Sequence, residues 1–165
     1  MPEFAHLTPD GTVRMVDVGD KPVSRRTAVA EGRMLMQPST LRLITAGSSR
    51  KGNVLETARL AGIMAAKRTP EWIPLCHSIS LSGISIQFTP EEPSSLLVQA
   101  TAVADGKTGV EMEALTAVSA ACLTVYDMCK SADREMEITG IRLMQKTGGK
   151  SGDFLRESSA APPET

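Results

Sequence analysis

The chain has 165 residues, which is the length of one ordinary domain and hardly of two. Hydrophobic residues make up 41% of it, enough to bury a core, and charged residues make up 22%. The formal net charge is −1, and aromatic residues account for only 3%. These values argue against a binder of duplex nucleic acid, a membrane-surface protein and a domain that stacks bases on aromatic side chains. The composition favours a compact domain whose partner is a small molecule.

The cysteines and the N-terminus indicate a cellular compartment. Cys76, Cys122 and Cys129 are odd in number and no two of them form a C-x-x-C pair, so we expect buried thiols in a reducing environment. The N-terminus has no basic segment followed by an apolar run, so no signal peptide is expected. The charge-free stretch 114–126 is too short to span a bilayer. We therefore expect a cytoplasmic protein that does not bind membranes.

The first half of the chain predicts one strand and two helices. Residues 1–14 mix Pro, Gly and polar residues, which is typical of a flexible terminus. A strand is expected around Thr27–Met36, and a short helix after Ser39. Asn53-Val-Leu-Glu56 is a capping box that begins a helix ending near Lys67.

The second half predicts a hairpin, a long helix and a last strand. Alternating residues indicate strands at 84–88 and 98–102, joined by a turn within 90–95. A second capping box, Thr108-Gly-Val-Glu111, predicts a helix that ends near Lys130. A strand is expected at 136–144, and residues 156–165 have the composition of a disordered tail.

These elements follow the order β-α-β-β-α-β in one domain, residues 15–155. That order predicts an α+β, ferredoxin-like fold, with an antiparallel sheet and helices on one face. The long helix carries an apolar stripe at alternating spacings of three and four, formed by Leu115, Val118, Cys122, Val125 and Cys129. Its opposite face is also uncharged, with Thr116, Ala120, Leu123 and Thr124. A helix that is apolar on both sides needs cover on both sides, so we expect a homo-oligomer.

Two candidate sites lie at helix ends. Asp127 and Lys130 are spaced i, i+3, so their side chains can meet. They form either an ordinary surface ion pair or a partly buried acid–base pair whose Lys pKa is brought toward neutrality. The loop before the 53–67 helix contains Lys51, and its cations and free helix N–H groups can bind an anion. A solvated basic loop is the alternative.

A third candidate is the glycine-rich segment with Lys146 and Lys150. Gly-Gly-Lys-Ser suggests a phosphate-binding P-loop, but Met144 stands where that motif needs a glycine. The two lysines and backbone N–H groups can still bind phosphates, unless the segment is simply a flexible tail.

Two further groups are less specific. Cys76-His77 is poor spacing for zinc, and adjacent side chains of an extended chain diverge, so neither a metal site nor a catalytic dyad is expected. His77 is either a structural histidine or a hydrogen-bonding group for a substrate. Glu111 and Glu113 lie in the first turn of the long helix, where acids are favourable, and Glu113 can also bind a donor-rich ligand such as a guanine-like ring.

Several of these segments together resemble one enzyme family. MVDV at 15–18, the Lys51-Gly52 loop with the following helix, IPLCH, KTGVEMEALTA, LTVYDMCK and GGKSGDF occur in the order of the cyclic pyranopterin monophosphate synthase (MoaC) family. The resemblance covers residues 15–154. It implies conversion of (8S)-3',8-cyclo-7,8-dihydroguanosine 5'-triphosphate to cyclic pyranopterin monophosphate and diphosphate, in molybdenum cofactor biosynthesis. It also implies a hexamer of three dimers with active sites between subunits.

The resemblance also implies roles for individual residues. Asp127 is the expected principal catalytic residue of this lyase, assisted by Lys51 and Lys130. Substrate-binding residues are expected among Leu75, Cys76, His77, Glu111, Met112 and Glu113. The expected triphosphate ligands are Lys146, Lys150 and Arg26. No cofactor is required by the sequence, although Mg²⁺ can accompany the triphosphate. The chain departs from the family at Ser78, where a proline usually follows the histidine.

The competing interpretation is a non-catalytic module of the same fold, which binds RNA or senses a small molecule. RNA binding predicts aromatic side chains on the central strands, where this chain has Ile84, Ile86 and Val98. A sensing module predicts an attached catalytic domain, for which 165 residues leave no room.

Overall fold

The computed structural model describes residues 6–8, 10–47 and 52–157. Its strands are β1 (Ser24–Leu35), β2 (Gly83–Glu91), β3 (Ser95–Gly106), β4 (Glu137–Thr147) and β5 (Phe154–Leu155). Its helices are α1 (Pro38–Thr45), α2 (Val54–Lys67), α3 (Thr69–Trp72) and α4 (Glu111–Cys129). All predicted strands and helices are present, while α3 and β5 were not predicted, because neither is long enough to show a periodic pattern.

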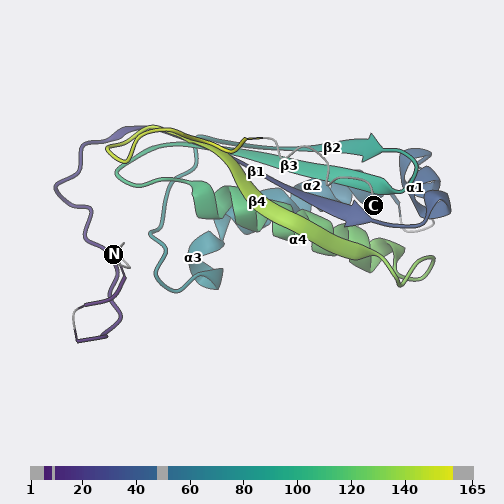
Figure 1. Cartoon of the computed structure of the whole chain (residues 1–165), viewed down its shortest axis with the longest axis horizontal. Helices are drawn as coiled ribbons and strands as arrows, with labels where there is room; N and C mark the ends of the chain where they lie inside the picture. Colours follow the sequence, from purple (N-terminus) through teal and green to yellow (C-terminus); the bar gives the residue numbers. More distant parts are fainter. Residues whose placement is uncertain (1–5, 9, 48–51, 158–165) are drawn as a thin grey trace.

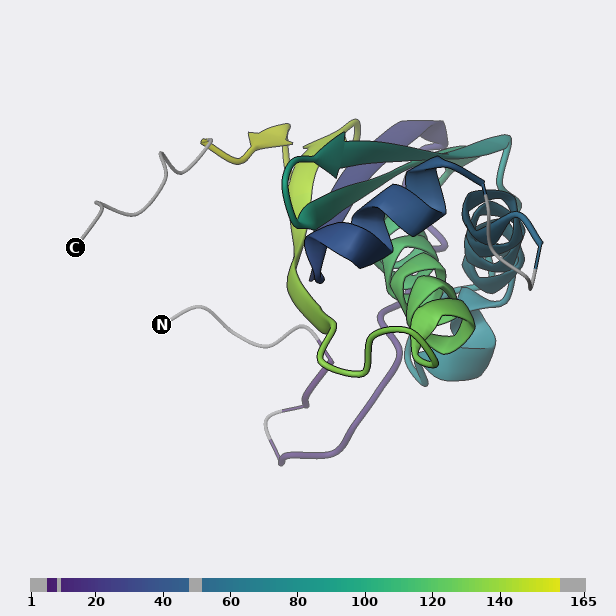
Figure 2. The same cartoon turned by 90° about the vertical axis from the view of Figure 1, so that its right-hand side faces the viewer.

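The strands form one antiparallel sheet in the order β2-β3-β1-β4-β5. Helices α1, α2 and α4 lie against the same face of it, as Figures 1 and 2 show. Side chains that alternate along β3 face these helices and are buried, namely Leu96, Val98, Ala100, Ala102 and Ala104. The prediction of a mixed fold with helices on one face of an antiparallel sheet is therefore confirmed.

Helices α2 and α4 pack closely because α2 has a glycine at their contact. A Cβ on Gly62 would collide with Ile86 Cδ1 of β2 and would lie 2.8 Å from the Ala117 carbonyl oxygen of α4. The two helices run in opposite directions, since α3, which follows α2, contacts α4, and Cys76 reaches Glu113 in the first turn of α4. The start of α2 and the end of α4 consequently lie at the same end of the domain (Figure 2).

Of the two predicted helix caps, the one at Asn53 forms and the one at Thr108 does not. Asn53 caps α2 as predicted, with its side chain accepting a hydrogen bond from the Glu56 N–H at 3.1 Å. The predicted box at Thr108 is wrong, because α4 begins at Glu111 with Val110 as its N-cap residue and no side-chain cap. Val110 is 1% exposed, and its burial in the core sets where the helix can start.

The predicted apolar stripe of α4 is largely buried, while its opposite face is only partly covered. Val118, Cys122, Val125 and Cys129 of the predicted stripe are buried in the core. On the other face, Thr116 and Ala120 are also buried, whereas Leu123 is 54% exposed. Leu60 and Met64 of α2 are exposed as well, so the helix layer presents apolar side chains to its surroundings.

The chain segments outside the sheet and helices are partly ordered. Residues 6–8 and 10–14 contain an isolated bridge between Leu7 and Val13, within the segment predicted to be flexible. Arg156 donates hydrogen bonds to the carbonyls of Leu143 and Met144, both at 2.8 Å, so the predicted loose tail does not begin there. The rest of that tail, 158–165, lies outside the described residues. Among the described residues, no helix is long and apolar enough to cross a membrane.

Candidate active site

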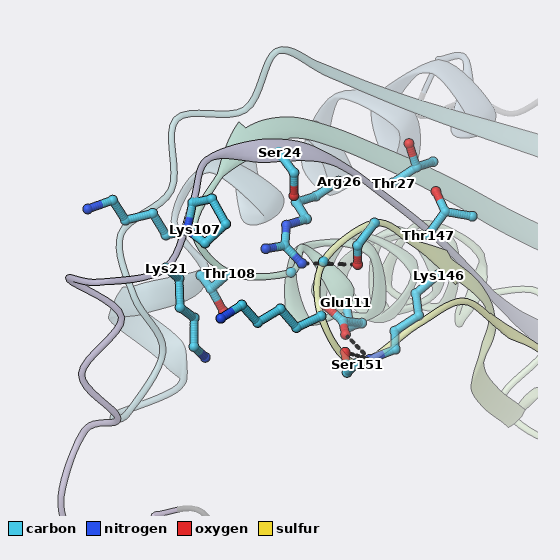
Figure 3. A pocket seen from close by; sticks show the side chains of 15 residues that line it. Lys21, Ser24, Arg26, Thr27, Lys107, Thr108, Glu111, Lys146, Thr147 and Ser151 are labelled. Atoms are coloured by element: carbon cyan, nitrogen blue, oxygen red, sulfur yellow. Dashed lines mark hydrogen bonds and ion pairs between the residues drawn. The ribbon is translucent and has the colours of Figure 1, made fainter.

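A basic pocket of about 620 Å³ lies beside the start of α4 (Figure 3). Its lining includes five basic side chains and one acidic one, Glu111; the basic ones are Lys21, Arg26, Lys107, Lys146 and Lys150. We call it the cationic pocket. Three predicted phosphate ligands, Arg26, Lys146 and Lys150, are thus brought together, although they come from β1, the end of β4 and the loop after it. A pocket with this excess of positive charge fits a multiply charged anion.

Arg26 is a buried residue of the pocket, and its guanidinium binds the two loops that flank it. The residue is 8% exposed, and its guanidinium donates to the carbonyls of Gly106 at 3.3 Å and Gly148 at 3.0 Å. Gly148 and the next residue, Gly149, have φ of +90° and +85°, and a Cβ at Gly149 would collide with the Arg26 guanidinium. Glycines are required for this close packing. Arg26 therefore joins the loops on either side of the pocket.

Lys146 reaches the pocket because β4 contains a bulge. The register between β1 and β4 shifts at Val29/Ala30, leaving Met144 unpaired and placing Lys146 opposite Ala28, which faces the helices. A bulge moves the following side chains to the other face of a sheet. Lys146 Nζ then lies 3.3 Å from Glu111 Oε1 and 3.2 Å from Ser151 Oγ, and Figure 3 shows the three side chains meeting.

Two basic residues of the pocket were missed from the sequence. Lys21 belongs to residues 15–22, which we call the N-terminal arm, and Lys107 belongs to the loop before α4. Lys107 Nζ donates to the Gly19 carbonyl at 2.5 Å and so links that loop to the arm. Lys107 begins the KTG segment that signalled the family resemblance, which could have identified it. No local signal marks Lys21, because only the tertiary path of the arm brings it here.

A second pocket of about 800 Å³ adjoins the first and is mainly apolar. Leu75, Cys76, His77 and Met112, all predicted substrate-binding residues, line it together with part of the N-terminal arm. Lys21, Thr108, Gly109 and Glu111 line both pockets. The two pockets together form one continuous surface with a basic end and an apolar end.

Cys76 and His77 point to different partners, as expected for neighbours in an extended segment. His77 Nε2 lies 2.8 Å from the Val16 carbonyl, which can only accept, so Nε2 carries the proton and donates. The ring thereby fastens the N-terminal arm to the loop before β2. Cys76 is only partly buried, unlike Cys122 and Cys129. Burial, and then the neighbouring Glu113 carboxylate, raises the pKa of Cys76 to about 11, which keeps the thiol protonated.

Glu113, a predicted substrate-binding residue, lines neither pocket and is buried next to Cys76. It is 2% exposed, its Oε1 lies 3.8 Å from Cys76 Sγ, and its buried Oε2 has no hydrogen-bond partner among the described residues. Burial raises the pKa of its carboxyl above 4.5. An unsatisfied buried oxygen is costly and is well suited to accept a hydrogen bond from a donor-rich ligand.

The raised pKa of Glu113 makes the stability of the fold depend on pH. The folded state holds the proton to higher pH than the unfolded chain, so this stabilising contribution is present below about pH 4.5 and is lost as pH rises through the folded-state pKa. Glu113→Gln removes this loss. We expect the difference in melting temperature, variant minus wild type, to increase from pH 4.5 to pH 7, as measured by circular dichroism. Exposed Glu56→Gln is the control; a pH-independent difference for Glu113→Gln would contradict the prediction.

Asp127 and Lys130 meet at the other end of α4. Lys130 Nζ donates to Asp127 Oδ1 at 2.6 Å, which confirms that the i, i+3 pair forms. The side chains of Asp127 and Lys130 are 68% and 52% exposed, so of the two alternatives the chain by itself shows the surface ion pair and not the partly buried pair. The hydrogen bond to Asp127 raises the pKa of Lys130 and does not bring it toward neutrality, because little burial opposes the carboxylate.

The two groups of predicted site residues are far apart. Glu111 and Asp127 are separated by 16 positions of α4, which corresponds to about 24 Å along the helix axis. Lys51 lies outside the described residues, but Gly52 precedes α2, whose start lies at the Asp127 end of the helix layer. One copy of the chain therefore places the two groups of predicted site residues at opposite ends of its helices.

A family model described as the MoaC family matches residues 15–149. The chain belongs to the MoaC family. Residues 15–149 include most of the lining of both pockets, the Asp127–Lys130 pair and every predicted site residue except Lys150.

Curated relatives cover almost the whole chain. A protein of Chloroflexus aurantiacus is 60% identical over 93% of this chain and 95% of its own length, and one of Chloroflexus aggregans is 58% identical over 96% of both. A protein of Mycobacterium bovis is 54% identical over 94% of this chain and 92% of its own length. The Chloroflexus proteins are named cyclic pyranopterin monophosphate synthase, and the Mycobacterium bovis protein carries that name with the number 1. These relatives favour the enzyme over the non-catalytic RNA-binding or sensing module.

Proposed function

We propose that this chain, like the synthases it resembles, converts (8S)-3',8-cyclo-7,8-dihydroguanosine 5'-triphosphate to cyclic pyranopterin monophosphate and diphosphate in molybdenum cofactor biosynthesis. The family membership carries this proposal, since relatives with that name match the chain over nearly its full length. The continuous basic and apolar surface supports it, because the substrate also has a charged end and a heterocyclic end.

In this proposal the cationic pocket binds the triphosphate. Lys146, Lys150, Lys21 and Lys107 supply positive charge, and Arg26 keeps the flanking loops in place. When the ribose-derived hydroxyl attacks the α-phosphorus and diphosphate leaves, these cations stabilise the developing negative charge. Any Mg²⁺ would be held mainly by the triphosphate oxygens, because Glu111 is the single carboxylate among the described residues that line this pocket and the cationic side chains are poor ligands for a metal ion.

The guanine-derived end would then lie in the apolar pocket. Leu75 and Met112 line this pocket and offer apolar contacts. Glu113 does not line it, so a hydrogen bond from a ring N–H or amino group to its unsatisfied, buried Oε2 would require the neighbouring Cys76 side chain to move aside. His77 uses Nε2 for the N-terminal arm, so a contact with the substrate would use Nδ1. Recognition would thus rest on hydrogen bonds and charge and not on aromatic stacking.

Asp127, Lys130 and Lys51 are the proposed catalytic groups. Opening the imidazole ring and closing the pterin ring requires several proton transfers, for which a carboxylate and two ammonium groups in one site supply acid and base. The ion pair between Asp127 and Lys130 keeps the two groups within reach of each other.

We propose that a second copy of the chain completes each active site, within a homohexamer of three dimers. The separation of about 24 Å along α4 is too large for one substrate molecule to contact both groups of predicted site residues in one copy. The exposed apolar residues Leu60, Met64 and Leu123 on the helix layer fit such an assembly. A cytoplasmic location agrees with the three thiols.

The direct test is incubation of the purified, assembled protein with the cyclised nucleotide triphosphate. We expect release of one diphosphate per substrate and formation of a pterin that becomes fluorescent on oxidation. GTP, which lacks the additional C3'–C8 bond between ribose and base, is the control and should release nothing. Absence of turnover by correctly assembled protein would refute the proposed function.

A further inference from the structure

A buried carboxylate lies in the loop that follows α4. Asp133 is 2% exposed and accepts three hydrogen bonds. Its Oδ2 accepts from the Gln37 N–H at 2.8 Å and from the Thr40 hydroxyl at 3.2 Å, and its Oδ1 accepts from the Glu135 N–H at 3.2 Å. The side chain therefore joins the start of α1 to the loop between α4 and β4.

Asp133 supplies what α1 lacks at its N-terminus. The N-cap residue of α1, Gln37, makes no side-chain capping bond, and Pro38 follows it at the first helical position. A carboxylate beside the free N–H groups of a helix start is electrostatically favourable. Because this carboxylate comes from a residue 96 positions later in the chain, the bond fixes two distant segments to each other.

The same loop holds the last turn of α4. The N–H groups of Ala132 and Asp133 donate to the Cys129 carbonyl at 2.8 and 3.1 Å, and the Lys130 N–H donates to the Tyr126 carbonyl at 2.8 Å. The loop is thus folded tightly against the helix end that carries Asp127 and Lys130. Figure 2 views this end of the domain, with α1 beside the end of α4.

We propose that Asp133 is a positioning residue for catalysis, which fixes the last turn of α4 so that Asp127 and Lys130 point toward the substrate. The inference rests on the proposed function, in which these two side chains do the chemistry. Both are more than half exposed in the chain by itself, so their own packing does little to orient them. Their direction depends on the backbone of the last turn. Val125 and Cys129 hold one side of this helix end in the core, and Asp133 adds a buried polar anchor that ties the following loop to α1.

If Asp133 positions the catalytic groups, its replacement should lower kcat and leave KM almost unchanged. Gln37, Thr40 and Glu135, to which Asp133 is hydrogen-bonded, do not line the cationic pocket, so substrate binding through the triphosphate should not respond to Asp133. Misplacement of catalytic groups by about 1 Å can cost up to about 100-fold in rate. We expect Asp133→Ala to lower kcat by about 10-fold to 100-fold, with KM within about twofold of the wild type.

The experiment compares Asp133→Ala with Ile86→Ala in the turnover assay. Ile86 is 1% exposed on β2, so its truncation also destabilises the fold but leaves the end of α4 untouched. Activities are expressed per folded protein, at a temperature where circular dichroism shows both variants folded. Hydrogen exchange provides a readout independent of activity: in Asp133→Ala, peptides from 37–45 and 126–135 should exchange faster, while peptides from 107–113 should not.

The outcomes separate the two proposals. Turnover by the wild type tests the proposed function, and the variants then test Asp133. A low kcat for Asp133→Ala with a near-normal kcat for Ile86→Ala supports the inference. An unchanged kcat for Asp133→Ala, or an equal loss in both variants, overturns it. If Asp133→Ala does not fold, Asp133→Asn and Thr40→Val replace it, because each removes part of the hydrogen bonding of Asp133. A lower kcat in these variants supports the inference, and an unchanged kcat in both overturns it.

Discussion

Replacing Asp127 with alanine is expected to lower kcat by about 100-fold to 10,000-fold, the range for loss of a general acid or base. The side chain is 68% exposed and adds little to the stability of the isolated fold, so the protein should still fold and assemble. Turnover of the cyclised nucleotide measures kcat, and gel filtration with light scattering measures assembly. Lys51→Ala is expected to behave alike, as the family resemblance implies.

The matched control for Asp127 is Glu56→Ala. Glu56 forms the corresponding i, i+3 surface ion pair on α2, with Arg59 at 3.2 Å, and its side chain is 60% exposed. Loss of an exposed ion pair by itself costs about 0–1 kcal/mol, so Glu56→Ala should retain near-normal kcat. Near-normal kcat in Asp127→Ala would remove Asp127 from the catalytic groups.

The second large effect is restoration of activity by mixing two inactive variants. If each site takes Asp127 from one copy and Lys146 from another, co-assembled Asp127→Ala and Lys146→Ala chains create some intact sites. Random pairing makes half of the dimers mixed, and one of the two sites in each mixed dimer is intact. Activity should therefore reach about a quarter of the wild-type value, although either variant alone is nearly inactive.

The control for this experiment pairs Asp127→Ala with Lys130→Ala. These residues lie at the same end of α4 and form one ion pair, so both come from the same chain. Every site of a mixed dimer therefore lacks either Asp127 or Lys130. We expect no restored activity. Equal restoration in both mixtures, or none in the first, would contradict the proposal that active sites are shared between subunits.

Local patterns predicted most elements because local interactions determine them. Asn53 caps α2 through a side-chain bond within one turn, and the alternation along β3 follows from burial of one face of the sheet. The same reasoning failed at Thr108. A capping pattern fits several starting points, and burial of Val110 in the core selected Glu111 as the first helical residue.

The candidate site was only partly predictable. Lys146 and Lys150 stood out through their glycine-rich segment. His77 and Glu113 were candidates from their residue types and positions, and the family resemblance added Cys76. Lys21 was missed, because it reaches the pocket only through the path of the N-terminal arm. Asp133 was missed as well, since its partners Gln37 and Thr40 are more than 90 positions away in sequence.

By itself, the sequence determined the family, the order of strands and helices, and the residue types of the site, because these depend on local patterns and on motifs. The near-zero net charge concealed the separation of basic from acidic and apolar groups. Only the tertiary structure gathered five basic side chains around one pocket, turned Lys146 toward Glu111 through a bulge, and put Asp127 at the far end of α4. The physical reason is that these placements depend on strand register and helix direction, which distant contacts set.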